Sequence, residues 1–155
     1  MSVLGELQPN KVFKYFEEIC SIPHGSRNLQ QISDYLVDFA KAHELKYRQD
    51  EDLNVIIWKD GSKGYEASEP VILQGHMDMV AVKEADCDKD MEKEGLDLEI
   101  NGDYISAKGT SLGGDDGIAV AYTLAVLDDE EMAHPPIEAI FTVNEEIGML
   151  GAATM

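Results

Sequence analysis

The sequence predicts an α/β fold in which helices cover both faces of one sheet. The chain has 155 residues, of which 44% are hydrophobic, and this is enough for the core of one compact domain. Helical and strand patterns alternate along the chain, as they do in α/β proteins. Polar residues follow the predicted strands, and such sheets bind ligands beyond the carboxyl ends of their strands. We therefore expect one domain with a site at that edge.

Two amphipathic surface helices are predicted in the first third of the chain. The stretch "NKVFKYFEEIC" (10–20) places apolar residues close to the helical period. The stretch "NLQQISDYLVDFAKAHEL" (28–45) repeats this pattern, and Asn28 with Gln31 is expected to form its capping pair.

Three strands, one hairpin and one buried helix are predicted in the rest of the chain. Residues 54–58 ("NVIIW"), 71–74 ("VILQ") and 137–143 ("IEAIFTV") are rich in β-branched side chains. Asn101-Gly102 within "LEINGDYI" is a strong hairpin signal. The stretch "GIAVAYTLAVLDD" (117–129) is apolar almost all round, which predicts a buried helix.

The charge and composition exclude several classes of partner. The formal net charge is -19, so the phosphates of nucleic acids and anionic lipid surfaces would repel the protein. We find no apolar run of membrane-spanning length and no signal-peptide pattern, and we therefore expect a cytoplasmic protein without a membrane or nucleic acid partner.

The first polar motif is "HMD", directly after the predicted strand 71–74. Residues two apart in an extended segment lie on the same face, so Asp78 can accept the proton of one ring nitrogen of His76. The other nitrogen is then free to bind a metal ion. Taken alone, such a histidine is more often a core residue satisfied by one hydrogen bond.

The second and third motifs bring in four acids. In "SLGGDDGIAVA", Asp115 and Asp116 precede the buried helix, and one of them is expected to be only its cap. The other, held between glycines, can give one oxygen to each of two cations. In "VNEEIG", Glu145 and Glu146 can share one site only if the chain turns where the strand ends, and Gly148 favours such a turn. An exposed acidic turn is the alternative.

With these motifs in view, the chain resembles the di-zinc metallopeptidases related to aminoacylase and carboxypeptidase G, and among them most closely the aminoacyl-histidine (Xaa-His) dipeptidases. The likeness rests on four stretches that span most of the chain. They are "SIPHGSRNLQQISDYLVDFAKAHEL", "LQGHMDMV", "GTSLGGDDGIAVA" and "VNEEIGMLGA".

The resemblance implies a role for each site residue. His76 corresponds to a zinc ligand, Asp78 to the acid that orients it, and Asp115 to the carboxylate that bridges two zinc ions. Glu145 corresponds to the general base and Glu146 to the ligand of the second zinc. Manganese or cobalt would suit the same ligands.

The resemblance also implies the fold, the domains and the reaction. It implies a three-layer α-β-α sandwich with a mixed sheet, of which residues 1–155 form the N-terminal part of the catalytic domain. The rest of that domain, with two further ligands, and a lid or dimerisation domain would be absent. A homodimer would be compatible with the resemblance. We expect the complete protein to hydrolyse dipeptides, Xaa-His dipeptides above all, with a zinc-bridged hydroxide, and this fragment to be inactive alone.

Two alternatives remain open at this stage. The first is a related metallohydrolase that acts on N-acyl amino acids or other dipeptides. The second is a metal-binding protein without catalysis. The other three histidines, His24, His43 and His134, are expected at the surface and not as ligands. Ser111, Gly114, Asn144 and Ile147 depart from the residues usual in the family, and none of these departures removes a ligand.

Overall fold

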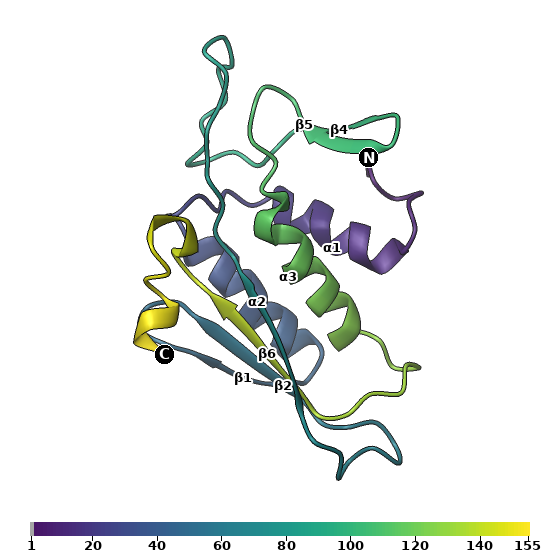
Figure 1. The fold of residues 1–155 in the computed structure, drawn as a ribbon. Coiled ribbons are helices and arrows are strands. Elements are labelled where there is room, and N and C mark those ends of the chain that lie inside the picture. Colours follow the sequence, from purple (N-terminus) through teal and green to yellow (C-terminus); the bar gives the residue numbers. More distant parts are fainter. Residues whose placement is uncertain (1) are drawn as a thin grey trace.

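The computed structural model describes residues 2–155, and its elements alternate between helices and strands as the sequence predicts (Figure 1). Two short 3₁₀ turns, Glu145–Ile147 and Ala152–Thr154, follow the last strand. The helices and strands are α1 (Asn10–Cys20), α2 (Gln30–Ala42), β1 (Lys46–Gln49), β2 (Val55–Lys59), β3 (Val71–His76), β4 (Leu98–Asn101), β5 (Tyr104–Ala107), α3 (Gly114–Leu127) and β6 (Ile137–Thr142).

The main sheet is mixed and has the strand order β1-β2-β6-β3. Strand β2 pairs antiparallel with both β1 and β6, whereas β3 pairs parallel with β6. In the parallel pair, His76 of β3 lies opposite Thr142 of β6, so the two strands end at the same edge. The α/β class and the mixed sheet are therefore confirmed.

All three helices lie on one side of this sheet. The Gln49 side chain of β1 donates a hydrogen bond to Ser33 of α2, and Lys59 of β2 donates one to the carbonyl of Val126 in α3. The strand register places Gln49 and Lys59 on the same face. Residues 2–155 thus form two of the three expected layers, and on the other face Ile72 is 61% exposed.

The core lies between this face and the helices. Ile57, Ala139 and Phe141 of the sheet are fully buried against Leu36 of α2 and Leu124 of α3. Helix α1 packs beside α3. The ring of Tyr15 in α1 contacts the ring of Phe39 in α2 edge to face. Strands β3 and β6, which contribute to this core, also lead to polar residues of the site.

Three details of the elements differ from expectation. Strand β1 has the sequence "KYRQ", and its polar, mostly exposed residues gave no strand signal. The cap expected at Asn28 is wrong, because its side-chain amide donates to the carbonyl of Glu92 and α2 has no side-chain cap. Helix α3 is not buried all round, since Ile118 and Tyr122 are 36% and 51% exposed.

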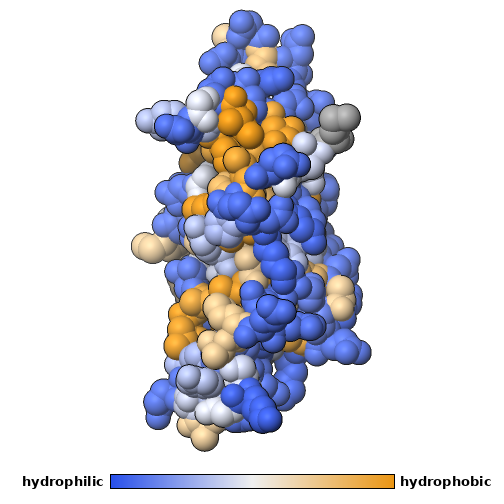
Figure 2. All heavy atoms as spheres, turned by 90° about the vertical axis from the view of Figure 1, so that its right-hand side faces the viewer, coloured by the Kyte–Doolittle hydropathy of each residue, from blue (hydrophilic) through white to orange (hydrophobic). Residues whose placement is uncertain are grey.

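The predicted hairpin forms, and it lies apart from the main sheet. Strands β4 and β5 pair antiparallel around Gly102, which has a positive φ of 60°. Apolar side chains gather at the height of this hairpin, and a smaller apolar group lies lower on the same face (Figure 2). The hairpin itself exposes Ile100 and Tyr104. Among the described residues, no helix has both the length and the apolar character needed to cross a bilayer.

Candidate metal centre

Three segments that are far apart in the sequence meet at the carboxyl ends of β3 and β6. His76 is the last residue of β3, and Glu145 and Glu146 begin the 3₁₀ turn that follows β6. Asp115 lies in the first turn of α3, which packs along β3. Because β3 and β6 are parallel neighbours, the chains that leave them run to the same edge.

The three predicted metal ligands come together at this edge. His76, Asp115 and Glu146 offer ligand atoms that all lie within 4.8 Å of one another. Nε2 of His76 is 3.1 Å from Oδ1 of Asp115 and 3.8 Å from Oε2 of Glu145. The imidazole is buried, whereas the Asp115 side chain is 87% exposed. In residues 2–155 no other group of three or more such side chains is brought together in this way.

Asp78 orients the ring of His76, as expected, but mainly through its backbone carbonyl and not through its carboxylate. Nδ1 of His76 lies 2.9 Å from the backbone carbonyl oxygen of Asp78 and 3.5 Å from its carboxylate. An N–H at Nδ1 therefore donates to the carbonyl. This bond directs Nε2, the remaining nitrogen, toward the acids.

The carboxylate of Asp78 instead holds the turn that carries the two glutamates. Its Oδ1 accepts the backbone N–H of Glu145 at 3.0 Å, and its Oδ2 accepts the N–H of Glu146 at 3.4 Å. Oδ2 also accepts the hydroxyl of Ser26 at 2.7 Å. The Asp78 side chain is fully buried, so these hydrogen bonds satisfy its charge inside the protein.

The turn required for both glutamates to share one site is present. Asn144 has a φ of 54°, and Gly148 closes the turn with a φ of 115°. The side-chain oxygen of Asn144 accepts the backbone N–H of Arg27 at 2.9 Å. The segment that carries Ser26 and Arg27 thus fastens the turn from outside.

The two aspartates of α3 have different positions. Asp115 reaches the imidazole nitrogen, while Oδ2 of Asp116 accepts the backbone N–H of His76 at 3.3 Å. This close approach of helix to strand requires a glycine at residue 75. A Cβ atom there would lie 3.0 Å from Oδ2 of Asp116 and 3.3 Å from Cβ of Ala119.

The electrostatics of this cluster favour a cation. Burial raises the pKa of Asp116, and the charge of Asp115 adds to this effect. Burial lowers the pKa of His76, but hydrogen bonds to Asp115 and to the Asp78 carbonyl outweigh it and raise the pKa overall. Among the described residues, no lysine or arginine forms an ion pair with these acids. Mixed imidazole and carboxylate ligands of this kind suit zinc.

The structure corrects two expectations about histidines and adds two residues that hold the site. His24 and His134 are buried, not at the surface, and each ring bonds a backbone carbonyl, of Ile22 and Pro135 respectively. Neither belongs to the ligand cluster. No structural role is predicted for Ser26 or Asn144 from the sequence, although both lie in stretches that carry the family resemblance, "SIPHGSRN" and "VNEEIG".

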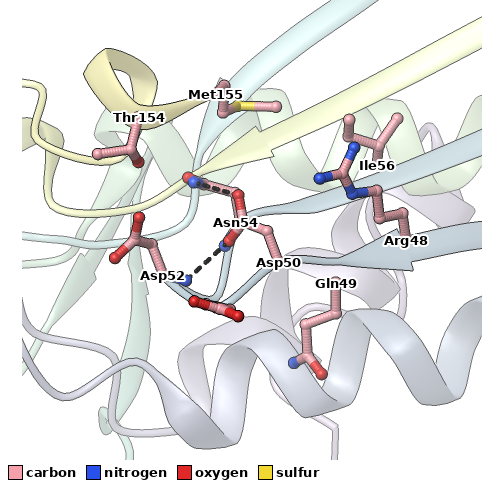
Figure 3. Close-up of a pocket in the computed structure, with 9 residues that line it drawn as sticks. Arg48, Gln49, Asp50, Asp52, Asn54, Ile56, Thr154 and Met155 are labelled. Atoms are coloured by element: carbon pink, nitrogen blue, oxygen red, sulfur yellow. Dashed lines mark hydrogen bonds between the residues drawn. The ribbon is translucent and has the colours of Figure 1, made fainter.

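A larger cavity than any at the metal centre lies elsewhere on the molecule, at the turn between β1 and β2. It has a volume of about 550 Å³ and is lined by residues of the β1–β2 turn and by Thr154 and Met155 (Figure 3). Its polar groups largely satisfy one another, since Asp50 accepts hydrogen bonds from Asn54 and from the N–H of Asp52. None of the predicted site residues lines it. Size alone therefore does not identify the site.

Comparisons with known proteins agree with the motifs. No protein-family model matches the chain. It is 41% identical over 152 residues to the cytosol non-specific dipeptidase of Escherichia coli K12, a match that covers 98% of this chain and 31% of that protein. The crystal structure of aminoacylhistidine dipeptidase from Vibrio alginolyticus matches with a TM-score of 0.95 and 39% identity, again over 98% of this chain and 31% of that one.

A more distant structure shares the fold. A tripeptidase from Staphylococcus aureus is 24% identical, with a TM-score of 0.77, over 97% of this chain and 40% of that one. The chain thus spans about a third of the length of the two relatives at 39% and 41% identity.

Proposed function

We propose that the complete protein is a metal-dependent dipeptidase, because 98% of this chain matches part of a cytosol non-specific dipeptidase and part of an aminoacylhistidine dipeptidase. The observation that carries the proposal is the meeting of His76, Asp115 and Glu146 within 4.8 Å. Three segments separated by tens of residues supply an imidazole and two carboxylates to one point, and within residues 2–155 no lysine or arginine forms an ion pair with these carboxylates.

We propose zinc as the metal, held by these three residues and by two ligands from further sequence of the complete protein. The arrangement of the imidazole supports this, because Nδ1 donates to the Asp78 carbonyl and leaves Nε2 as a ligand. Asp115, which is largely exposed, can offer one oxygen to each of two ions. Bound there, two zinc ions would make water acidic enough to attack a peptide bond at neutral pH and would polarise the peptide carbonyl.

In this proposal Glu145 is the general base. Its carboxylate is 40% exposed and faces the same nitrogen as Asp115, so it can reach both the site and the solvent. It would take the proton of the attacking water and later give it to the leaving amine. Asp78 would act on the reaction indirectly, since it fixes the backbone of Glu145 and Glu146 and the ring of His76.

The names of the relatives guide the proposed substrates. One is an aminoacylhistidine dipeptidase and the other a non-specific dipeptidase, so we propose dipeptides in general, with Xaa-His dipeptides among them. The E. coli relative is named as a cytosol enzyme, and we propose the same compartment. A lid or dimerisation domain in the complete protein, and a homodimer, stay predictions.

The test is Glu145→Gln in the protein expressed from its complete gene and loaded with zinc. We expect kcat for a dipeptide to fall 10²- to 10⁴-fold, the usual contribution of a general base. The zinc content, measured by atomic emission, should stay at the wild-type level because Glu145 is not among the three ligands.

The matched control is Glu138→Gln, which removes an acid from β6 away from the cluster. Its kcat should equal that of the wild type. If Glu145→Gln keeps its kcat within threefold, the proposed mechanism is wrong. A panel of Xaa-His dipeptides, other dipeptides and N-acyl amino acids then decides between the dipeptidase and its metallohydrolase relatives. Stoichiometric zinc without any turnover would instead indicate a metal-binding protein.

A further inference from the structure

A second cavity opens directly beside the candidate metal centre. It has a volume of about 370 Å³, and Glu146 belongs both to its wall and to the ligand cluster. We propose that this cavity binds the side chain of the amino-terminal residue of the substrate and selects an apolar side chain. The inference rests on the proposed dipeptidase function. The apolar part of its wall consists of Met79, Val80, Ala81, Val82, Met91 and Ile147.

The cavity has room for the side chain of one residue. Pockets for small molecules measure about 300 to 1,000 Å³, and this one lies at the small end of that range. Val80 and Val82 are 46% and 57% exposed, and Ile147 is 38% exposed. A leucine-sized side chain that covers them would remove apolar surface of both partners from water.

The charge of the cavity decides which end of the dipeptide enters it. Among the described residues of its wall, the charged ones are Glu92 and Glu146, and both are acidic. A dipeptide carries an ammonium group at one end and a carboxylate at the other. Because Glu146 is the proposed zinc ligand, the free carboxylate of the wall is that of Glu92. It attracts the ammonium and repels the carboxylate of the substrate, so the amino-terminal residue is the one placed here.

The walls of the cavity are tied to one another before any ligand binds. The backbone N–H of Ser26 donates to the carbonyl of Met79 at 3.2 Å, and the N–H of Met79 donates to the carbonyl of His24. The side chain of Asn28 donates to the carbonyl of Glu92 at 3.0 Å, which joins the far wall to the same segment. These bonds hold the irregular chain after β3 against the segment before α2, so the cavity is preformed.

The test fills the cavity with Val80→Phe in the zinc-loaded protein from the complete gene. The measured quantity is the ratio of kcat/KM for Leu-His to that for Gly-His, which differ only in the amino-terminal side chain. We expect this ratio to fall about tenfold or more, as is typical when an apolar pocket loses room for a few carbon atoms. The control is Val71→Phe, since Val71 is 43% exposed at the opposite end of β3 and should keep the wild-type ratio.

A binding measurement separates the cavity from the reaction. Calorimetry on the metal-depleted protein compares leucinamide with glycinamide, which carry the ammonium but no carboxylate. Leucinamide should bind more tightly to the wild type, and Val80→Phe should remove this preference. Conversely, Met91→Ala enlarges the cavity and should raise kcat/KM for Phe-His relative to Leu-His.

The remaining outcomes each decide one question. The inference is overturned if Val80→Phe changes kcat/KM for Leu-His and for Gly-His by the same factor. The same result is expected where another part of the protein fills the cavity. It is likewise overturned if Val80→Phe alters the ratio for Gly-Leu over Gly-Gly instead, because the cavity would then hold the carboxyl-terminal side chain. If the zinc-loaded wild type cleaves no dipeptide, the proposed function fails. The calorimetric preference for leucinamide then decides by itself whether the cavity binds an apolar side chain.

Discussion

Strand β6 contributes to two regions of the molecule that differ in almost every physical respect. Its middle, with Ala139 and Phe141, lies fully buried among apolar side chains of the sheet and helices. Its carboxyl end leads within a few residues to a cluster of carboxylates around a buried imidazole. The first region has regular extended backbone, whereas in the second Asn144 and Gly148 adopt positive φ angles.

The difference indicates where stability and chemistry are located. The core removes apolar surface from water and so drives folding. The carboxyl edge gathers acids that repel one another and orders irregular backbone to hold them, which does not favour the folded state. A protein retains such an arrangement for a ligand, and each prediction below separates the two regions.

The largest effect is expected in the core. Phe141→Ala should lower the free energy of unfolding by about 3–5 kcal/mol, because the residue is fully buried and a cavity would remain. Chemical denaturation of the metal-free protein measures this. Glu146→Gln is the contrasting variant, and it should cost less than about 0.5 kcal/mol or even stabilise, since it removes one repelling charge. Equal losses in both variants would contradict the division into two regions.

The next largest loss of stability is expected for a change of Asp78, a buried acid that holds the glutamate turn. Asp78→Asn should lower the free energy of unfolding by about 1.5–3 kcal/mol, the range for hydrogen bonds to a charged group. An amide cannot accept all three of the N–H and O–H donors that the carboxylate now accepts. Ser26→Ala removes a single donor and should cost less by the same denaturation measurement. If Asp78→Asn is neutral, the carboxylate does not hold the turn.

The positive φ of Asn144 gives a smaller prediction. Asn144→Ala should cost about 1–2 kcal/mol, because alanine is disfavoured at a φ of 54° and the N–H of Arg27 loses its acceptor. Asn144→Asp keeps a side-chain oxygen and tolerates this backbone conformation, so it should stay close to the wild type. Denaturation curves for the two variants measure the difference, and an equal loss in both would show that the side-chain bond is unimportant.

The smallest effect concerns His24, which is buried and lies outside the cluster. Burial lowers the pKa of His24 below its ordinary value in the folded protein. The unfolded chain therefore binds more protons below about pH 6.5, and stability is lost as the pH falls through that window toward the folded pKa. The loss is at most about 1.4 kcal/mol per pH unit.

His24→Asn tests this, because its amide N–H can still donate to the carbonyl of Ile22 while it cannot take up a proton. Denaturation at pH 7 and pH 5.5 in the presence of a chelator should show a smaller loss for the variant than for the wild type. Identical pH dependence in both proteins would mean that His24 does not titrate differently on folding.

The sequence by itself determined the class of fold, the position of most elements and the identity of the residues that cluster. Apolar periodicity predicted α1, α2 and the strands, because side chains that face a core must recur at the period of the helix or strand. The motifs around His76, Asp115 and Glu146 named the residues that the fold then brings within 4.8 Å. Their roles as ligands stay predictions.

Only the tertiary structure decided the arrangements that depend on partners remote in sequence. Strand β1 has no apolar pattern and forms because β2 offers it an edge to pair with. The Asp78 carboxylate holds the glutamate turn, while its carbonyl orients His76, and no local spacing distinguishes these two uses. The burial of His24 and the cavity beside Glu146 likewise depend on segments meeting in space. Sequence patterns report which face a residue turns inward, whereas the atom that it meets there is set by the packing of the whole chain.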